Sequence, residues 1–162
     1  MNIAIILAGG VGSRFGNQIP KQFLKIKDKT ILEICVDAFE QNEQIDEIGI
    51  VMNEDYIEMT KELVKANHWH KVSKILNGGK ERYESSVNAI KAFAQHHDID
   101  NANFLIHDAA RPLVTQRIIN DTIAALDKNP AIMVAIPTTD TILQLSDDKT
   151  SIQNIPDRSY LY

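Results

Sequence analysis

Short, wholly apolar runs alternate along this chain with longer segments whose apolar residues recur at helical spacing. Residues 3–7 are apolar on both faces, which is typical of a parallel strand covered on both sides. Further strands are predicted at residues 47–52, 71–76, 103–106 and 131–136, and helices between them at residues 30–41, 54–66, 82–95 and 116–126. This order predicts an α/β fold, a Rossmann-like, mostly parallel sheet with helices on both faces.

The pattern changes after Pro137. Residues 141–145 and 151–155 are expected to form two strands around a polar turn. A lone two-stranded hairpin is only marginally stable in water, so we expect this arm to pack against another subunit. The predicted organisation is a nucleotide-binding α/β domain over residues 1–137 and a β-arm over 138–162 for dimerisation and acceptor binding.

Charge and composition exclude several classes of protein. The 162 residues carry a net charge of -5, which gives no electrostatic support for a nucleic-acid groove. No run approaches the roughly 18 apolar residues of a membrane span, and the apolar start lacks the basic region of a signal peptide. We therefore expect a cytoplasmic protein. The single cysteine, Cys35, excludes an internal disulfide and lies in an apolar run typical of a core position.

The loop after the first strand carries the clearest chemical signal. Four glycines occur within residues 9–16, and Arg14 and Lys21 accompany them. Glycines let the backbone approach a ligand closely and aim N–H groups at phosphates, while the two cations supply charge. The loop lacks the Lys-Ser/Thr of a P-loop, and Phe15 stands where a dinucleotide fingerprint needs its third glycine. A glycine-rich turn without a ligand is the structural alternative.

Five segments together resemble the cytidylyltransferases that act on ribitol 5-phosphate and 2-C-methyl-D-erythritol 4-phosphate. They are residues 7–16 with Pro-Lys-Gln-Phe at 20–23, Gly-Gly-Lys-Glu-Arg-Tyr-Glu-Ser-Ser at 78–86, His-Asp-Ala-Ala-Arg-Pro at 107–112, Asp-Thr at 140–141 and Ile-Pro-Asp-Arg at 155–158. The first and third motifs are the more specific, and the resemblance spans nearly the whole chain. It implies transfer of CMP from CTP to a polyol phosphate with release of pyrophosphate.

The resemblance also implies roles for individual residues. Arg14 and Lys21 would be catalytic, because cations stabilise the charge that builds on the α-phosphate and on the leaving pyrophosphate. The implied nucleotide-binding residues are Leu7, Ala8, Gly9, Gly10, Gly12, Ser13, Gly78, Gly79, Arg82, Ser85, Asp108 and Ala109. For Ser85, a purely structural role at a helix start remains the alternative.

Asp108 follows a strand, where an acidic side chain commonly faces a ligand. In similar enzymes this aspartate lies near the ribose and the acceptor, while Mg²⁺ bridges the triphosphate. Asp108 is thus the candidate metal ligand, although contact with hydroxyls is favoured. Arg111 either helps to bind the acceptor or pairs with Asp108. His107 is expected to pack rather than act as a base, because a phosphate nucleophile is already ionised near neutral pH.

The acceptor is predicted from the end of the chain. Thr141 and Arg158 would complete the acceptor site from the arm of a neighbouring subunit, with an exposed arginine as the alternative for Arg158. Residues 155–162 look closer to the ribitol-phosphate branch, whereas Ala110 is more common in the methylerythritol branch. We favour D-ribitol 5-phosphate and keep 2-C-methyl-D-erythritol 4-phosphate as the alternative.

Two other classes and one question of length stay open. The chain could be a non-catalytic nucleotide-binding domain, or a Rossmann oxidoreductase, against which the glycine spacing argues. No acidic residue follows the loop at the end of a second strand, as a dinucleotide site requires. Members of the family continue for several tens of residues past the point matched by Tyr162, so we expect the C-terminal part of the family domain to be absent here.

Overall fold

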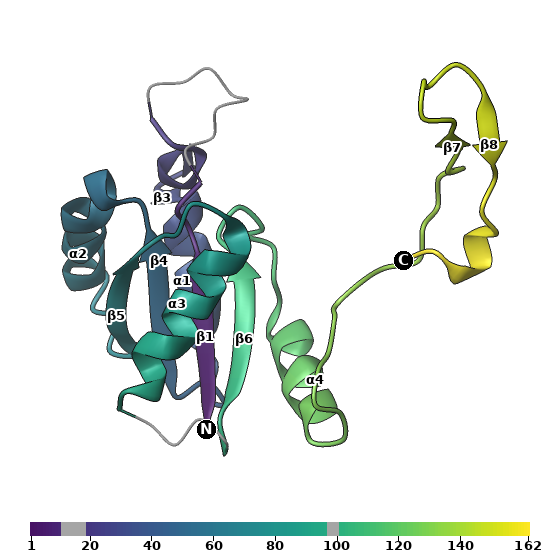
Figure 1. Cartoon of the computed structure of the whole chain (residues 1–162). Helices are drawn as coiled ribbons and strands as arrows, with labels where there is room; N and C mark the ends of the chain where they lie inside the picture. The colour runs from purple at the N-terminus through teal and green to yellow at the C-terminus, as the bar shows by residue number, and fades with distance from the viewer. Residues whose placement is uncertain (11–18, 97–100) are drawn as a thin grey trace. The chain divides into compact units, whose positions relative to one another are not determined.

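A four-stranded parallel sheet forms the centre of the protein. The computed structural model describes residues 1–10, 19–96 and 101–162 and divides the chain into two compact units, 1–128 and 129–162. In the first unit the strands are β1 (Asn2–Leu7), β4 (Glu47–Met52), β5 (Val72–Asn77) and β6 (Asn103–Asp108), arranged in the order β5-β4-β1-β6 (Figure 1). All the pairings are parallel, as the sequence predicted.

Helices cover both faces of this sheet, which confirms the predicted fold class. The alternation of side chains along β1 sends Ala4 and Ile6 into one core and Ile3 and Ile5 into another. The first core is closed by α1 (Ile31–Glu40), α2 (Ile57–Ala66) and α4 (Gln116–Leu126). The second is closed by α3 (Arg82–Ala94), which crosses the front of the sheet in Figure 1. Within residues 1–128 the strand and helix bounds lie within two residues of those predicted, except that residues 54–56 form a 3₁₀ turn, η2 (Glu54–Tyr56), before α2.

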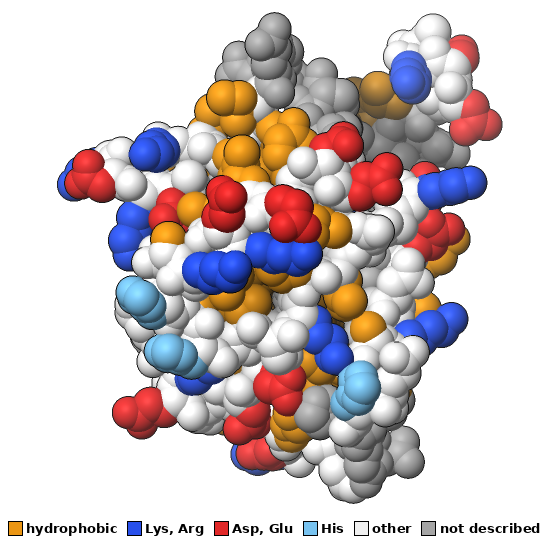
Figure 2. Space-filling view, turned by 90° about the vertical axis from the view of Figure 1, so that its left-hand side faces the viewer, with side chains coloured by type: hydrophobic (Ala, Val, Ile, Leu, Met, Phe, Trp, Pro, Cys, Tyr) orange, Lys and Arg blue, Asp and Glu red, His pale blue; other side chains and the backbone are white. Residues whose placement is uncertain are grey.

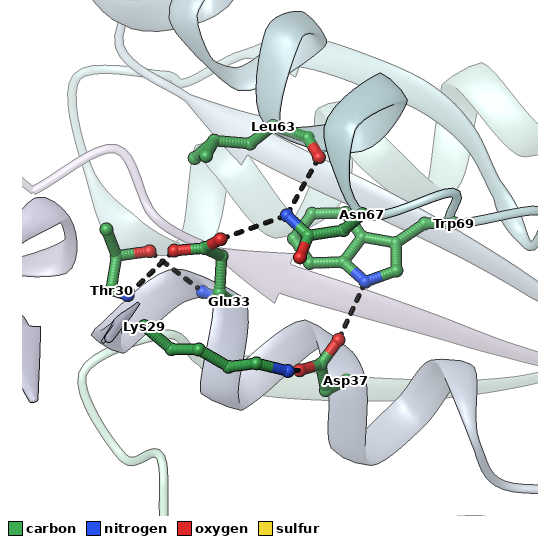
Figure 3. Close-up of polar contacts among 7 residues, drawn as sticks. All are labelled: Lys29, Thr30, Glu33, Asp37, Leu63, Asn67 and Trp69. Carbon is green, nitrogen blue, oxygen red and sulfur yellow. Dashed lines mark hydrogen bonds and ion pairs between the residues drawn. The ribbon is translucent and has the colours of Figure 1, made fainter. Parts of the chain in front are cut away.

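A polar network joins α1 to the end of α2 (Figure 3). At the start of α1, Thr30 and Glu33 form a capping box, and the second carboxylate oxygen of Glu33 accepts a hydrogen bond from Asn67 at 3.0 Å. Trp69 Nε1 donates to Asp37 at 2.8 Å, and Lys29 pairs with the same carboxylate. These contacts fix α1 and the end of α2 relative to each other.

The α2 helix ends in a Schellman motif. His68 N–H donates to the Lys65 carbonyl and Trp69 N–H to the Val64 carbonyl, both at 3.2 Å. His68 takes the left-handed conformation, with φ 53°, that this motif requires at its position. A histidine therefore stands where glycine is usually found.

The second unit contains the predicted hairpin in a shorter form. Its strands are β7 (Gln144–Leu145) and β8 (Ile152–Asn154), which pair antiparallel, and η4 (Arg158–Tyr160) follows them. The strand predicted at residues 131–136 is wrong for this structure, which has no strand there and exposes Met133 and Ile136. An apolar run becomes a strand only when another strand is available to bond its backbone, and this segment pairs with none in the described chain.

The side of the protein that carries α2 has a mixed charge. Figure 2 views this side and shows basic and acidic side chains interspersed rather than gathered into one basic patch. Lys61 and Glu58, which form an ion pair at 2.7 Å, lie on α2. Across the described residues, no helix is both long and apolar enough to cross a membrane.

Candidate active site

The loops that leave β1, β5 and β6 start at the same edge of the sheet. The register pairs Leu7 with Val51 on one side and with Asp108 on the other. Ala8 N–H donates to the Val51 carbonyl at 2.7 Å, and Ala109 N–H donates to the Leu7 carbonyl at 3.0 Å. The carboxyl ends of parallel strands are where α/β sheets bind their ligands. The sheet therefore holds three of the predicted binding segments in one row.

A cavity of about 430 Å³ lies at this edge, a size suited to a small organic ligand. Most of the predicted pocket residues in the first unit line it, and Gly78 lies directly beside it. The predicted residues in the lining are Leu7, Ala8, Gly9, Gly10, Lys21, Gly79, Arg82, Ser85, Asp108, Ala109 and Arg111. The structure thus brings together segments that lie up to a hundred residues apart in the sequence.

The Gly78-Gly79 turn is tied to the start of α3. Gly78 N–H donates to the Met52 carbonyl at 2.9 Å, and Gly79 N–H donates to Ser85 Oγ at 2.9 Å. Ser85 does belong to the first turns of α3, but Glu81 is the N-cap, so the Ser85 hydroxyl serves the glycine turn. A Cβ on Gly79 would lie 2.5 Å from the Glu84 Cβ. Only glycine fits at this position without displacing its neighbours.

Asp108 lies between two guanidinium groups. Arg82 Nε donates to Asp108 Oδ1 at 3.0 Å, and Arg111 Nε lies 3.4 Å from Oδ2. Of the two roles predicted for Arg111, the ion pair with Asp108 is present in this structure. Each carboxylate oxygen of Asp108 therefore has one arginine partner. Across the described residues, no three His, Cys, Asp or Glu side chains are grouped as a metal site would need.

Lys21 supplies a cation that is not committed to a carboxylate of the described chain. It lies in η1 (Lys21–Phe23), a single 3₁₀ turn, and its side chain lines the cavity. The adjacent Gln22 is buried and donates to the carbonyls of Ala8 and Gly10. Phe23 stacks on Tyr56 with ring centroids 5.3 Å apart. The turn that carries Lys21 is thus anchored on both the polar and the apolar side.

His107 and Cys35 take the structural roles predicted for them. His107 Nε2 lies 3.0 Å from the Arg111 carbonyl, and its ring packs on Phe39. Burial lowers the pKa of His107, although the bond to the Arg111 carbonyl and the charge of Asp108 partly oppose that shift. Burial raises the pKa of the Cys35 thiol to about 12, with the negative charge of Asp108 adding to the effect. The Cys35 thiol is therefore not a nucleophile near neutral pH, and the His107 ring is held by the Arg111 carbonyl and Phe39.

Five predicted residues lie either outside the described residues or in the second unit. Gly12, Ser13 and Arg14 lie outside the described residues. Thr141 and Arg158 belong to the second unit, where an Arg158 guanidinium nitrogen donates to the Thr139 carbonyl at 3.1 Å. The lining also includes five residues for which no role was predicted, namely Gln22, Val51, Lys80, Glu81 and Ala110. Several of these lie within the motifs quoted above. Their position in the sequence next to a predicted site residue was the feature that could have identified them.

The parallel sheet and its edge cavity define an α/β protein of the nucleotide-binding type, with cations, glycine turns and the acidic residues Glu81 and Asp108 around one pocket. Residues 2–162 match the family of 2-C-methyl-D-erythritol 4-phosphate cytidylyltransferase. The chain belongs to that family.

Relatives within the family carry two kinds of name. The chain is 45% identical over 161 residues to the bifunctional ribulose 5-phosphate reductase/CDP-ribitol pyrophosphorylase Bcs1 of Haemophilus influenzae, covering 99% of this chain and 34% of that protein. It is 40% identical to a 2-C-methyl-D-erythritol 4-phosphate cytidylyltransferase of Thermobifida fusca, covering 98% and 64%. A ribitol-5-phosphate cytidylyltransferase of Lactiplantibacillus plantarum is 37% identical, with 100% and 70% covered. The chain therefore spans about a third to two thirds of these relatives' lengths.

A solved structure has the same fold. The 4-diphosphocytidyl-2C-methyl-D-erythritol synthase of Anaerococcus prevotii superposes with a TM-score of 0.78 at 27% identity, covering 99% of this chain and 65% of that one. The fold likeness therefore extends over nearly all of this chain.

Proposed function

We propose that this protein transfers CMP from CTP to a polyol phosphate, with D-ribitol 5-phosphate favoured as the acceptor. An oxygen of the acceptor phosphate attacks the α-phosphorus of CTP, the bond from that phosphorus to the bridging oxygen breaks, and pyrophosphate leaves. The observation that carries the proposal is the edge cavity, which is lined together by Gly9 and Gly10 after β1, by Gly79, by Asp108 and by the uncommitted cation of Lys21.

Lys21 and Arg14 stabilise the charge of the transition state in this proposal. Attack adds negative charge at the α-phosphate and at the leaving pyrophosphate, and fixed cations in a partly dehydrated cavity lower that barrier. Arg82 and Arg111 are already paired with Asp108, so Lys21 and Lys80 are the cations of the described lining that can give their whole charge to the triphosphate.

The nucleoside end of CTP is assigned to the other side of the cavity. The Gly78-Gly79 turn offers backbone donors and acceptors to a pyrimidine edge, with Ser85 holding the turn in place. Asp108 accepts hydrogen bonds from hydroxyl groups of the ribose or the acceptor. Its two arginine partners leave room for this role because each carboxylate oxygen has two lone pairs.

Mg²⁺ enters the proposal with the triphosphate. Among the described residues, no three His, Cys, Asp or Glu side chains are grouped so that they could hold it. Mg²⁺ commonly keeps several waters and binds mainly through substrate phosphates.

Two further parts of the proposal concern the second unit and the compartment. Thr141 and Arg158 bind the acceptor phosphate from the arm of a partner subunit in a homodimer. Exposed apolar side chains in residues 129–162, with Met133 89% and Tyr160 82% exposed, support an interface there. A cytoplasmic location supplies the CTP. Sedimentation of the protein at micromolar concentration tests the dimer, and a monomeric mass would remove it.

A pyrophosphate-release assay tests the function. The protein is given CTP and Mg²⁺ with D-ribitol 5-phosphate, with 2-C-methyl-D-erythritol 4-phosphate, or with no acceptor. We expect release with one acceptor and none without an acceptor. Release with the methylerythritol phosphate alone would select the alternative that the family and the Thermobifida relative support. CTP binding without release under any condition would leave a non-catalytic nucleotide-binding domain.

Two substitutions connect the assay to residues. Lys21→Ala should lower kcat on the order of 10²–10³-fold while the protein stays folded, and Lys25→Ala on the exposed β2 strand (Lys25–Ile26) is its matched control. Arg158→Ala should raise the acceptor KM more than the CTP KM. Equal effects on both constants would remove Arg158 from the acceptor site.

A further inference from the structure

Gln22 is a polar residue that is almost completely buried. It is 3% exposed, next to a lysine that faces the cavity and a phenylalanine that packs on Tyr56. Burying a primary amide costs free energy unless its N–H groups find acceptors. An apolar residue would fill this position more cheaply if packing were its whole purpose.

The amide nitrogen of Gln22 is used on the loop that follows β1. Nε2 donates to the Ala8 carbonyl at 2.6 Å and lies 3.3 Å from the Gly10 carbonyl. The thioether sulfur of Met52 lies 4.0 Å from the same nitrogen, so the amide crosses from η1 to both β1 and β4. One buried side chain therefore holds the Ala8 and Gly10 carbonyls of the loop.

The hydrogen bond to Ala8 fixes the direction of the next backbone N–H. In a trans peptide the carbonyl and the N–H point in opposite directions, and no described peptide bond is cis. With the Ala8 carbonyl turned toward Gln22, the Gly9 N–H is turned away from it. Gly9 lines the cavity.

We propose that Gln22 is a positioning residue, which sets the Gly9 N–H and the neighbouring Lys21 in one fixed geometry for the triphosphate of CTP. The inference rests on the proposed function and adds a residue to it. Gln22 is among the lining residues, but its Nε2 is engaged by the loop carbonyls, so it acts through the Ala8-Gly9 peptide and through the backbone turn that it shares with Lys21. Errors of about 1 Å in such donors can cost on the order of 10²-fold in rate.

Two substitutions separate positioning from packing. Gln22→Met keeps the volume and suits an apolar site, but it removes both N–H donors. Gln22→Glu keeps the shape but places a carboxyl oxygen where the amide nitrogen faced the Ala8 and Gly10 carbonyls. An ionised carboxylate repels these carbonyls, and only the protonated acid can donate a hydrogen bond to them. Gln95→Glu, at the exposed end of α3 remote from the cavity, is the control for the charge change.

The expected results differ between the variants. Gln22→Met should lower kcat at least tenfold at every pH, with the acceptor KM within a factor of two of wild type. Gln22→Glu should lower kcat further at pH 8. Its kcat relative to wild type should recover at least threefold as the pH falls to 6, because burial raises the pKa of a carboxyl and a larger fraction of it is then protonated. Gln95→Glu should match wild type throughout. A side chain that served only packing would not produce a pH-dependent recovery.

Binding measurements keep this inference separate from the proposed function. CTP affinity is measured by calorimetry with Mg²⁺ for each folded variant, and far-ultraviolet circular dichroism verifies the fold. If wild type turns over no acceptor, the proposed function fails, while a tenfold loss of CTP affinity in Gln22→Met would still uphold the role of Gln22. If wild type is active and folded Gln22→Met keeps both kcat and CTP affinity, the inference is overturned, even if Gln22→Glu does not fold.

Discussion

Replacing Gly79 by alanine should damage both stability and ligand binding. The added Cβ would lie 2.5 Å from the Glu84 Cβ and 3.1 Å from the Glu84 carbonyl carbon. Favourable contacts between carbon atoms occur at about 3.5–4.0 Å, so the turn or the start of α3 must move by about 1 Å. Both colliding atoms are close to the backbone, so no rotamer change removes the overlap.

The size of the effect follows from that displacement. Overpacking of this kind costs about 1–3 kcal/mol, which for a chain of this length lowers the melting temperature by about 3–10 °C. The movement also weakens the 2.9 Å hydrogen bond from Gly79 N–H to Ser85 Oγ. The part of the cavity formed by the Gly78-Gly79 turn, to which we assign the cytosine of CTP, should therefore lose its shape. CTP affinity should fall about tenfold or more.

A matched glycine makes the experiment specific. A Cβ on Gly10 meets no atom within 4 Å in the described part of the chain, although Gly10 also lines the cavity. Gly10→Ala should leave the melting temperature within about 2 °C of wild type and weaken CTP binding alone. Thermal unfolding by circular dichroism and CTP titration calorimetry measure both quantities. A Gly79→Ala protein with wild-type melting temperature and wild-type CTP affinity would refute the steric argument.

Three more predictions concern single side chains. His68→Gly should raise the free energy of unfolding by up to about 1 kcal/mol in urea titrations, because glycine adopts the left-handed conformation without a Cβ clash; His68→Ala should give no such gain. The pKa of His107 is lowered in the folded state, so the unfolded state binds more protons as the pH falls below about 6.5, and stability is lost there. His107→Gln should therefore show a flatter stability profile between pH 7.5 and 5.5, and an identical slope would contradict this. Cys35, with its pKa raised to about 12, should resist thiol reagents at pH 8 until denaturant is added.

The strands and helices of the first unit could be predicted because each has a local signature. The run at residues 3–7 is apolar on both faces, and the real strand is indeed covered on both faces. Residues 131–136 carry the same signature but form no strand. Apolar residues report what a segment can bury, whereas a strand also needs a neighbour to bond with, and the sequence does not specify that neighbour.

The candidate site was predictable where glycines and charges recur at motif spacing. Lys21, Gly79 and Asp108 were found in this way, and they line one cavity. Gln22 was not given a role, because a single amide has no periodicity and its partners are backbone carbonyls. The pairing of Arg82 with Asp108 was not predicted either, since it depends on how α3 meets the end of β6.

The register of β6 has a consequence for insertions and deletions. Successive side chains of a strand point to opposite faces, so His107 packs on Phe39 while Asp108 reaches Arg82 at the mouth of the cavity. Removing one residue between 103 and 106 would exchange these two orientations, presenting an imidazole to the mouth and turning a carboxylate toward the aromatic core. The chemistry at the end of β6 thus depends on whether the number of residues in the strand is odd or even. Insertions and deletions in the family should therefore occur in the loops and not change the length of β6 by an odd number of residues.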